Sequence, residues 1–204
     1  MKIKNILAVT ALVGLGMTAQ AAPIVFNFLS DGSNVALGSS HTFTSGGASL
    51  TAYASTSALY AKNSNGEQGL GLTGDPTGDN EIWAGQFVQL LSQTGSSQFT
   101  ISSLSFDSTT AGETSDIYFS TVQGVLGILI GSVNSNTSFN ILSAYQNGYL
   151  GVTAGGIGGG GTGLEPANVL IASATGYVPD GGTTVAMLGG ALTALGLIRR
   201  KLVA

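Results

Sequence analysis

Residues 98–106 read Gln-Phe-Thr-Ile-Ser-Ser-Leu-Ser-Phe, and apolar side chains alternate with polar ones along most of this stretch. Alternation with a period of two puts successive side chains on opposite faces of a β-strand, so the pattern predicts a half-buried strand. The apolar phase slips between Ile101 and Leu104. This slip predicts a bulge or bend in the strand near Ser102 and Ser103.

Similar short runs lie on both sides of this stretch, bounded by Gly, Asn, Ser and Asp, and no helical stripe lies between the two ends of the chain. The runs predict strands at Ile24–Phe28, Leu50–Ala54, Ala58–Lys62, Gln86–Leu91, Ile117–Phe119, Gly127–Val133, Ser138–Leu142, Tyr149–Thr153 and Val169–Thr175. About ten short strands joined by turn-rich links predict an all-β fold. We expect a single antiparallel β-sandwich, jelly-roll-like in form, over residues 22–176.

The N-terminus has the three parts of a secretory signal in the usual order. They are a basic start at Lys2 and Lys4, an apolar core over Ile6–Met17, and small residues at Ala19-Gln20-Ala21. The order predicts a signal peptide over residues 1–21, passage through the secretion machinery, and cleavage by signal peptidase between Ala21 and Ala22. The alternative is a buried helix at the start of the domain.

The C-terminus carries an uncharged stretch of sixteen residues, 183–198, between a turn-forming motif at 178–182 and a basic end at 199–201. As a helix it would cover about 24 Å, somewhat less than the roughly 30 Å of a hydrocarbon core. The pattern predicts a short transmembrane helix whose basic end stays cytoplasmic, with the preceding chain outside. The alternative is a soluble amphipathic helix, but the stretch has no polar face.

Residues 177–204 resemble the PEP-CTERM sorting signal, in the variant with Val-Pro-Asp in place of Pro-Glu-Pro. The resemblance implies recognition by exosortase, a membrane-embedded transpeptidase that removes the helix near the motif. It further implies export through the inner membrane, transient anchoring by the tail, and then a place on the cell surface or in the extracellular matrix of a biofilm, associated with exopolysaccharide. The residues that carry it are the sorting motif Val178, Pro179, Asp180, Gly181 and Gly182 and the basic stop Arg199, Arg200 and Lys201.

Charge separates the ends of the chain from its body. Lys62 is the only cation between residues 22 and 180, and it stands against all ten acids, which gives this part a net charge of −9 against −4 for the whole chain. A body with one lysine cannot neutralise a phosphate backbone, which excludes nucleic acid as a partner. The absence of cysteine excludes a thiol nucleophile and a cysteine-based metal site.

Residues 69–83 read Gly-Leu-Gly-Leu-Thr-Gly-Asp-Pro-Thr-Gly-Asp-Asn-Glu-Ile-Trp. They resemble a Gly-Leu-Gly-Val … Asp-Asn-Glu-Ile-Asp segment of many PEP-CTERM proteins. Three carboxylates and an amide on a glycine-rich loop form a candidate calcium site; they belong to Asp75, Asp79, Asn80 and Glu81. The alternative is a solvated turn whose Asp and Asn side chains bond their own backbone. No other cofactor is expected.

Trp83, the only tryptophan, follows this loop directly. An aromatic face beside polar oxygens is a candidate platform for a sugar, although a lone tryptophan in a sandwich is more often part of the core. The loop and Trp83 together therefore suggest a carbohydrate-binding module, with calcium as an optional ligand, as the second candidate function.

Catalysis has little support in the sequence. His41 has no recognisable partner pattern. The pairs Asp79/Glu81 and Asp107/Glu113 would suit a glycoside hydrolase only if folding brought each pair to within about 5–10 Å. We therefore expect no enzymatic activity, and the favoured function is a structural or interaction role in a surface or matrix protein. Glycoside hydrolysis is the third candidate.

Overall fold

The computed structural model describes residues 22–76, 78–93, 99–109, 112–156, 167–178 and 189–190. All strands among these residues fall within one compact unit, Ala22–Pro179. The described residues form the strands β1 (Ile24–Asn27), β2 (Val35–Gly38), β3 (Ser40–Ser45), β4 (Ala48–Ala54), β5 (Leu59–Ser64), β6 (Glu67–Leu72), β7 (Ile82–Trp83), β8 (Val88–Ser92), β9 (Thr100–Asp107), β10 (Glu113–Ser120), β11 (Ile128–Val133), β12 (Ser138–Asn140), β13 (Gly148–Gly156) and β14 (Asn168–Tyr177), and a short 3-10 helix at Ser143–Tyr145.

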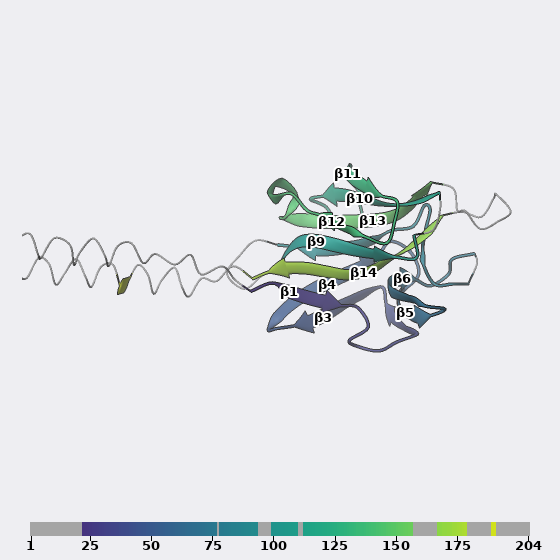
Figure 1. Cartoon of the computed structure of the whole chain (residues 1–204), viewed down its shortest axis with the longest axis horizontal. Coiled ribbons are helices and arrows are strands. Elements are labelled where there is room, and N and C mark those ends of the chain that lie inside the picture. Colours follow the sequence, from purple (N-terminus) through teal and green to yellow (C-terminus); the bar gives the residue numbers. More distant parts are fainter. Residues whose placement is uncertain are drawn as a thin grey trace, which may run out of the picture. The chain divides into compact units, whose positions relative to one another are not determined.

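The strands form two antiparallel sheets (Figure 1). One has the order β12-β9-β14-β6-β5-β2, with β1 and β7 also paired to β14, and the other has the order β11-β10-β13-β8-β4-β3. All-β structure with antiparallel sheets is therefore confirmed. The jelly-roll-like connectivity remains a prediction.

Both sheets contribute side chains to one hydrophobic core. Phe26, Leu70 and Ile171 enter it from the first sheet, and Leu90 and Val152 enter it from the second. These side chains are at most 1% exposed. Since each buried aliphatic or aromatic side chain contributes about 1.5–3 kcal/mol, this shared core is the main source of stability.

The irregularity predicted in β9 is present. Ser103 pairs with Thr175 of β14, but Gly176, the next residue of β14, pairs with Ile101, so Ser102 has no partner in the register. Two residues of β9 therefore lie opposite one step of β14, which is a β-bulge. The bulge keeps the apolar side chains on both sides of it facing the core.

The predicted signal peptide (1–21, with Ala21) and the sorting tail from Pro179 onward, apart from Gly189 and Gly190, lie outside the described residues. Ala22, the residue after the predicted cleavage point, is exposed two residues before β1. Within the described ranges, no helix combines the length and apolarity needed to cross a membrane. The signal peptide and the transmembrane helix remain predictions.

Candidate functional site

The loop between β6 and β7 is organised by Asp75. Its Oδ1 accepts the backbone N–H of Gly78 (2.7 Å), and its Oδ2 accepts the backbone N–H groups of Asn80 and Glu81, the latter at 3.2 Å. An aspartate that bonds the backbone of its own loop fixes the course of the chain there. These contacts are those of a turn in which an aspartate side chain bonds the backbone of its own loop.

Position 71, in the apolar strand before this loop, requires a glycine because another part of the chain lies against it. A Cβ at position 71 would lie 2.1 Å from the carbonyl oxygen of Asn80, so only glycine lets the returning chain lie against β6. Asn80 itself has a left-handed φ of 60°, which asparagine tolerates better than most residues. Together these two residues aim the next side chain, Glu81, into the molecule.

The three acids of the predicted calcium site lie in different surroundings. Asp79 is exposed, whereas Asp75 is buried, and the carboxylate of Glu81 points toward Lys62 and Ser108. In the described part of the chain, no three His, Cys, Asp or Glu side chains are grouped so that they could hold a metal ion. The calcium site remains a prediction.

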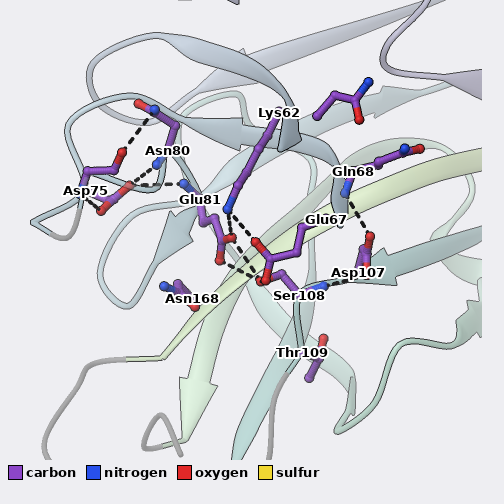
Figure 2. Close-up of polar contacts among 12 residues, drawn as sticks. Lys62, Glu67, Gln68, Asp75, Asn80, Glu81, Asp107, Ser108, Thr109 and Asn168 are labelled. Atoms are coloured by element: carbon purple, nitrogen blue, oxygen red, sulfur yellow. Dashed lines mark hydrogen bonds and ion pairs between the residues drawn. The ribbon is translucent and has the colours of Figure 1, made fainter. Parts of the chain in front are cut away.

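Glu81 belongs to a buried cluster that the sequence did not reveal, and we call Lys62, Glu67, Glu81 and Ser108 the Lys62 cluster (Figure 2). Lys62 Nζ donates to Glu67 Oε2 (2.6 Å) and to Glu81 Oε1. Ser108 Oγ lies 2.9 Å from Glu67 Oε1 and from Glu81 Oε2. Lys62 and Glu81 are each only 2% exposed. The cluster joins β5, β6, the approach to β7 and the end of β9.

Asn168 and Glu113 extend this cluster at the start of β14 and β10. One terminal atom of the Asn168 carboxamide lies 3.0 Å from Glu81 Oε2 and 3.3 Å from Glu113 Oε1. The hydrogen bonds to both carboxylates form when the carboxamide nitrogen occupies this position and donates to them. The backbone N–H of Asn168 also donates to Glu113 Oε1 at 3.2 Å.

The two glutamates of the cluster are driven to different protonation states. Burial, together with the neighbouring Glu67, raises the pKa of Glu81 to about 7, against the opposing effect of Lys62. Burial also acts to raise the pKa of Glu67, but its hydrogen bonds with Lys62 and Ser108 outweigh that effect and lower it. Burial acts to lower the pKa of Lys62, yet its bonds to both acids raise it overall. One lysine thus serves two carboxyls, and Glu81 holds a proton up to near-neutral pH.

Ser108 is held in a sparsely populated conformation. Its φ of 58° lies in the left-handed region, which a serine adopts only when its surroundings impose it. The hydroxyl bonds to both glutamates and the bond from Ser108 N to Asp107 Oδ1 (2.9 Å) hold it there.

The acid pairs predicted from sequence have other roles. Asp107 accepts the backbone N–H of Gln68 and the side chain of Asn136, each at 2.9 Å, while Glu113 bonds Asn168. Asp79 is exposed, whereas Glu81 is buried. The two acids brought together are instead Glu67 and Glu81. No spacing rule predicts that pair, and the only hint in the sequence is that Lys62 is the sole lysine of the body.

Trp83 lies in β7, where it pairs with Asn168 of β14. Its side chain is half-buried, and the indole Nε1 is a buried donor with no partner among the described residues. Gln86 Oε1 is likewise a buried acceptor without a partner there, although Gln86 N donates to the Trp83 carbonyl (3.0 Å). His41, on β3, is bonded to Asp31 at 2.7 Å.

Comparison with known proteins gives a match at the C-terminus. Residues 177–202 match the family model of the VPDSG-CTERM motif. Val178 is partly buried and packs against the core, whereas Pro179, Asp180, Gly181, Gly182, Arg199, Arg200 and Lys201 lie outside the described residues. The chain therefore carries a PEP-CTERM-like sorting motif, which confirms the resemblance and implies export, cell-surface sorting and an exosortase-type processing partner. No curated protein and no solved structure matches the chain.

Proposed function

We propose that the protein has a non-enzymatic structural or interaction role on the cell surface or in the extracellular matrix, in association with exopolysaccharide. The sorting motif at residues 177–202 is the observation that carries the proposal. In this proposal residues 1–21 act as the signal peptide and residues 183–198 hold the tail in the membrane. An exosortase-like transpeptidase then removes the tail and leaves the β-domain at the surface or in the matrix.

The composition of the β-domain supports this role. Charged residues make up 8% of the chain, and the chain contains 32 glycines along with many hydroxyl and amide side chains. Such a surface can exchange hydrogen bonds with a neutral, hydrated polysaccharide without strong charge repulsion. Lys62, the one cation of the body, is buried and paired, so attraction to anionic groups is not the basis of the association.

Alteration of the motif in the full chain tests the sorting step. In cells that express exosortase, we expect Pro179→Ala combined with Asp180→Ala to leave the protein in the membrane fraction with its tail attached. The control is Thr193→Ala, a conservative change in the apolar span that leaves the motif intact. Immunoblots of membrane, surface and medium fractions give the readout. Wild-type distribution of the double variant would contradict the proposal.

A second candidate, a carbohydrate-binding module at the Asp75–Trp83 loop, has one specific observation in its favour. Trp83 Nε1 offers a buried donor and Gln86 Oε1 a buried acceptor, both without a partner among the described residues. A sugar hydroxyl can accept from the indole or donate to the carboxamide oxygen once a movement of the loop exposes these two atoms. Because Trp83 is the only tryptophan, titration with soluble glycans should shift its fluorescence, and the shift should be absent in Gln86→Leu. Unchanged emission in the wild type would remove this candidate.

Calcium binding to the Asp75–Trp83 loop is part of this second candidate function. If calcium binds Asp75 and Asp79 with loop carbonyls, it should raise the melting temperature, and EDTA should reverse the rise. The matched control is Asp79→Asn, which removes one exposed carboxylate and should abolish the shift. An identical melting temperature in calcium and in EDTA would eliminate the calcium site.

A further inference from the structure

The segment that joins β10 to β11 displays large apolar side chains to solvent. Of the seven such side chains that are exposed in the described part of the chain, four lie within eight consecutive residues. They are Val122, Val125, Ile128 and Leu129, which are 51–57% exposed, and we call them the apolar edge. Exposed apolar side chains gathered in this way mark a contact surface, whereas single ones are ordinary.

The turn before β11 is held in place from beneath. Gln89, only 1% exposed, accepts the backbone N–H of Gly124 at its Oε1 (2.6 Å) and donates from its Nε2 to the carbonyl of Val125 (2.8 Å). Leu126 lies so close to Gly151 that a Cβ there would be 2.8 Å from its Cδ2. Because the turn is fastened in this way, its two valines stay at the surface, and binding has little ordering of the turn to offset.

β11 adds an unpaired strand edge to this surface. It ends its sheet (Figure 1), and among the described residues it pairs only with β10. An edge strand directs alternate N–H and C=O groups away from its neighbour, where another strand can satisfy them. Such edges are usually protected by charge or proline, but residues 128–133 read Ile-Leu-Ile-Gly-Ser-Val. Ile130 has no partner in the register with β10, so the regular part of the edge is short.

We propose that two copies of this chain associate through the hairpin of β10 and β11, with β11 of one copy antiparallel to β11 of the other. A two-fold axis places the apolar edge of each copy against the same surface of the other, which is the commonest symmetry of a dimer. Because the edge is short, the association is weak and depends on concentration, so dilute samples contain the separate chain. The proposal depends neither on sorting nor on exopolysaccharide.

The distribution of charge favours a second copy at this surface. Residues 22–180 carry a net charge of −9, but residues 117–164 contain no charged residue. Asp116, the acid that precedes this segment, pairs with Ser132, near the end of β11 remote from Ile128. Two strongly acidic bodies repel each other, so their contact costs least where uncharged segments meet.

Other occupants fit this surface less well. The acidic body repels anionic lipid, and its one cation, Lys62, is buried. Sugars stack on aromatic faces, whereas the apolar edge has only aliphatic side chains. A strand with the same uncharged sequence matches both the free backbone and the apolar side chains, and each copy of the chain supplies one.

Cross-linking of the full chain in permeabilised cells tests the proposal, since the chain has no cysteine of its own. Ser132→Cys places a thiol at an exposed position of β11, and a short bismaleimide should link two copies into a product of twice the mass. The matched control is Thr44→Cys, exposed on β3 at the opposite end of the same sheet, which should give little of this product. The proposal would be overturned by no product from Ser132→Cys, by equal yields from both variants, or by a product that contains a different protein instead.

A second substitution in the Ser132→Cys chain locates the contact. Leu129→Asp brings two carboxylates together across the axis and should lower the yield about tenfold or more. Leu142→Asp, the same change at a leucine that is 68% exposed outside the hairpin, should keep the yield. A loss in Leu142→Asp with none in Leu129→Asp would contradict the proposal. Because the two single-cysteine chains are compared first, poor folding of Leu129→Asp does not alter the result of that comparison.

Discussion

Two consecutive parts of the chain, residues 62–116 and 117–164, are built in contrasting ways. The first holds Lys62 and seven of the ten acids, whereas the second has no charged residue. Each part supplies strands to both sheets. In the first part, buried charged groups meet specific partners in the Lys62 cluster. In the second, side-chain amides and hydroxyls have that role; Gln146 Nε2, for example, donates to the carbonyl of Ile141 at 3.0 Å.

The contrast shows that the few charges of this body do more than keep it in solution. Glu81, Glu113 and Lys62 are at most 3% exposed. Burial of a charge is costly unless it is paired, so these residues are tolerated because they are bonded to one another and to Ser108 and Asn168. The uncharged part instead leaves large apolar side chains in contact with solvent: Val122, Val125, Ile128 and Leu129 are 51–57% exposed.

Among the changes considered, the removal of the Lys62 cation should lower the free energy of unfolding the most. Lys62→Met leaves Glu67 and Glu81 facing each other without the amine, and loss of one partner of a buried pair costs about 3–5 kcal/mol. Urea denaturation should show this loss in the free energy of unfolding. Lys62→Met combined with Glu81→Gln should recover part of it, because the uncompensated acid is gone. Wild-type stability of the single variant would show that the cluster does not stabilise the fold.

The second effect is a dependence of stability on pH. In the folded protein the pKa of Glu81 is raised from 4.5 to about 7, so the folded state holds this proton more tightly than the unfolded chain. Its stabilising contribution is complete below pH 4.5 and is lost as the pH rises through 7. Lys62, Glu67, Ser108, Asn168 and Glu113 face or flank this group. Because the pKa of Glu67 is lowered, its own contribution changes below this window.

Urea midpoints measured from pH 4.5 to 8 test this dependence. The free energy of unfolding contributed by Glu81 should fall as the pH rises, and Glu81→Gln should flatten that part of the curve. Asp79→Asn, at an exposed acid of the same loop, is the matched control and should keep the wild-type slope. Equal slopes in all three proteins would contradict the assignment.

A smaller loss of stability is expected from a substitution of Asp75, in the loop that directs Glu81 into the Lys62 cluster. Asp75→Ala leaves the N–H groups of Gly78, Asn80 and Glu81 without their acceptor, and an unsatisfied buried group costs about 1–3 kcal/mol. Thermal melting in EDTA measures this loss apart from any effect of calcium. Asp75→Asn keeps one acceptor oxygen and should lose less. A larger loss in Asp75→Asn than in Asp75→Ala would contradict this role.

The smallest effect should occur in the uncharged part. Leu129 is 54% exposed at the start of β11, so Leu129→Ser should change the free energy of unfolding by no more than about 0.5 kcal/mol. Leu150→Ala, at a fully buried position of β13, should by contrast cost about 2–5 kcal/mol. Comparable losses in the two variants would show that Leu129 is covered by something in solution.

The sequence predicted the fold better than the site, for a physical reason. Strand alternation depends on neighbours two residues apart, so it is visible in the stretch from Phe99 to Phe106, and even the bulge at Ser102 follows from it. The Lys62 cluster depends on residues 62, 67, 81 and 108, brought together only by the pairing of distant strands. In the sequence, the glycines before the loop are only part of a motif. The need for glycine at position 71 comes from its close contact with Asn80, which exists only in the folded chain.

The sorting motif could be identified from sequence because it is recognised as a linear segment. Charge, apolarity and the Val-Pro-Asp residues follow one another within 177–202, the range that the family model matches. A binding site in the β-domain is formed by residues that are not contiguous in the sequence. For this reason the sequence identifies Trp83 and the acidic loop only as candidate binding residues.

The most direct test of the account is the intact mass of the protein recovered from the surface or medium of cells that express exosortase. Cleavage after Ala21 and removal of the tail near Asp180 predict a chain of residues 22 to about 180, with the Arg199-Arg200-Lys201 end absent. A recovered protein whose mass still includes Ala204 would contradict sorting by tail removal.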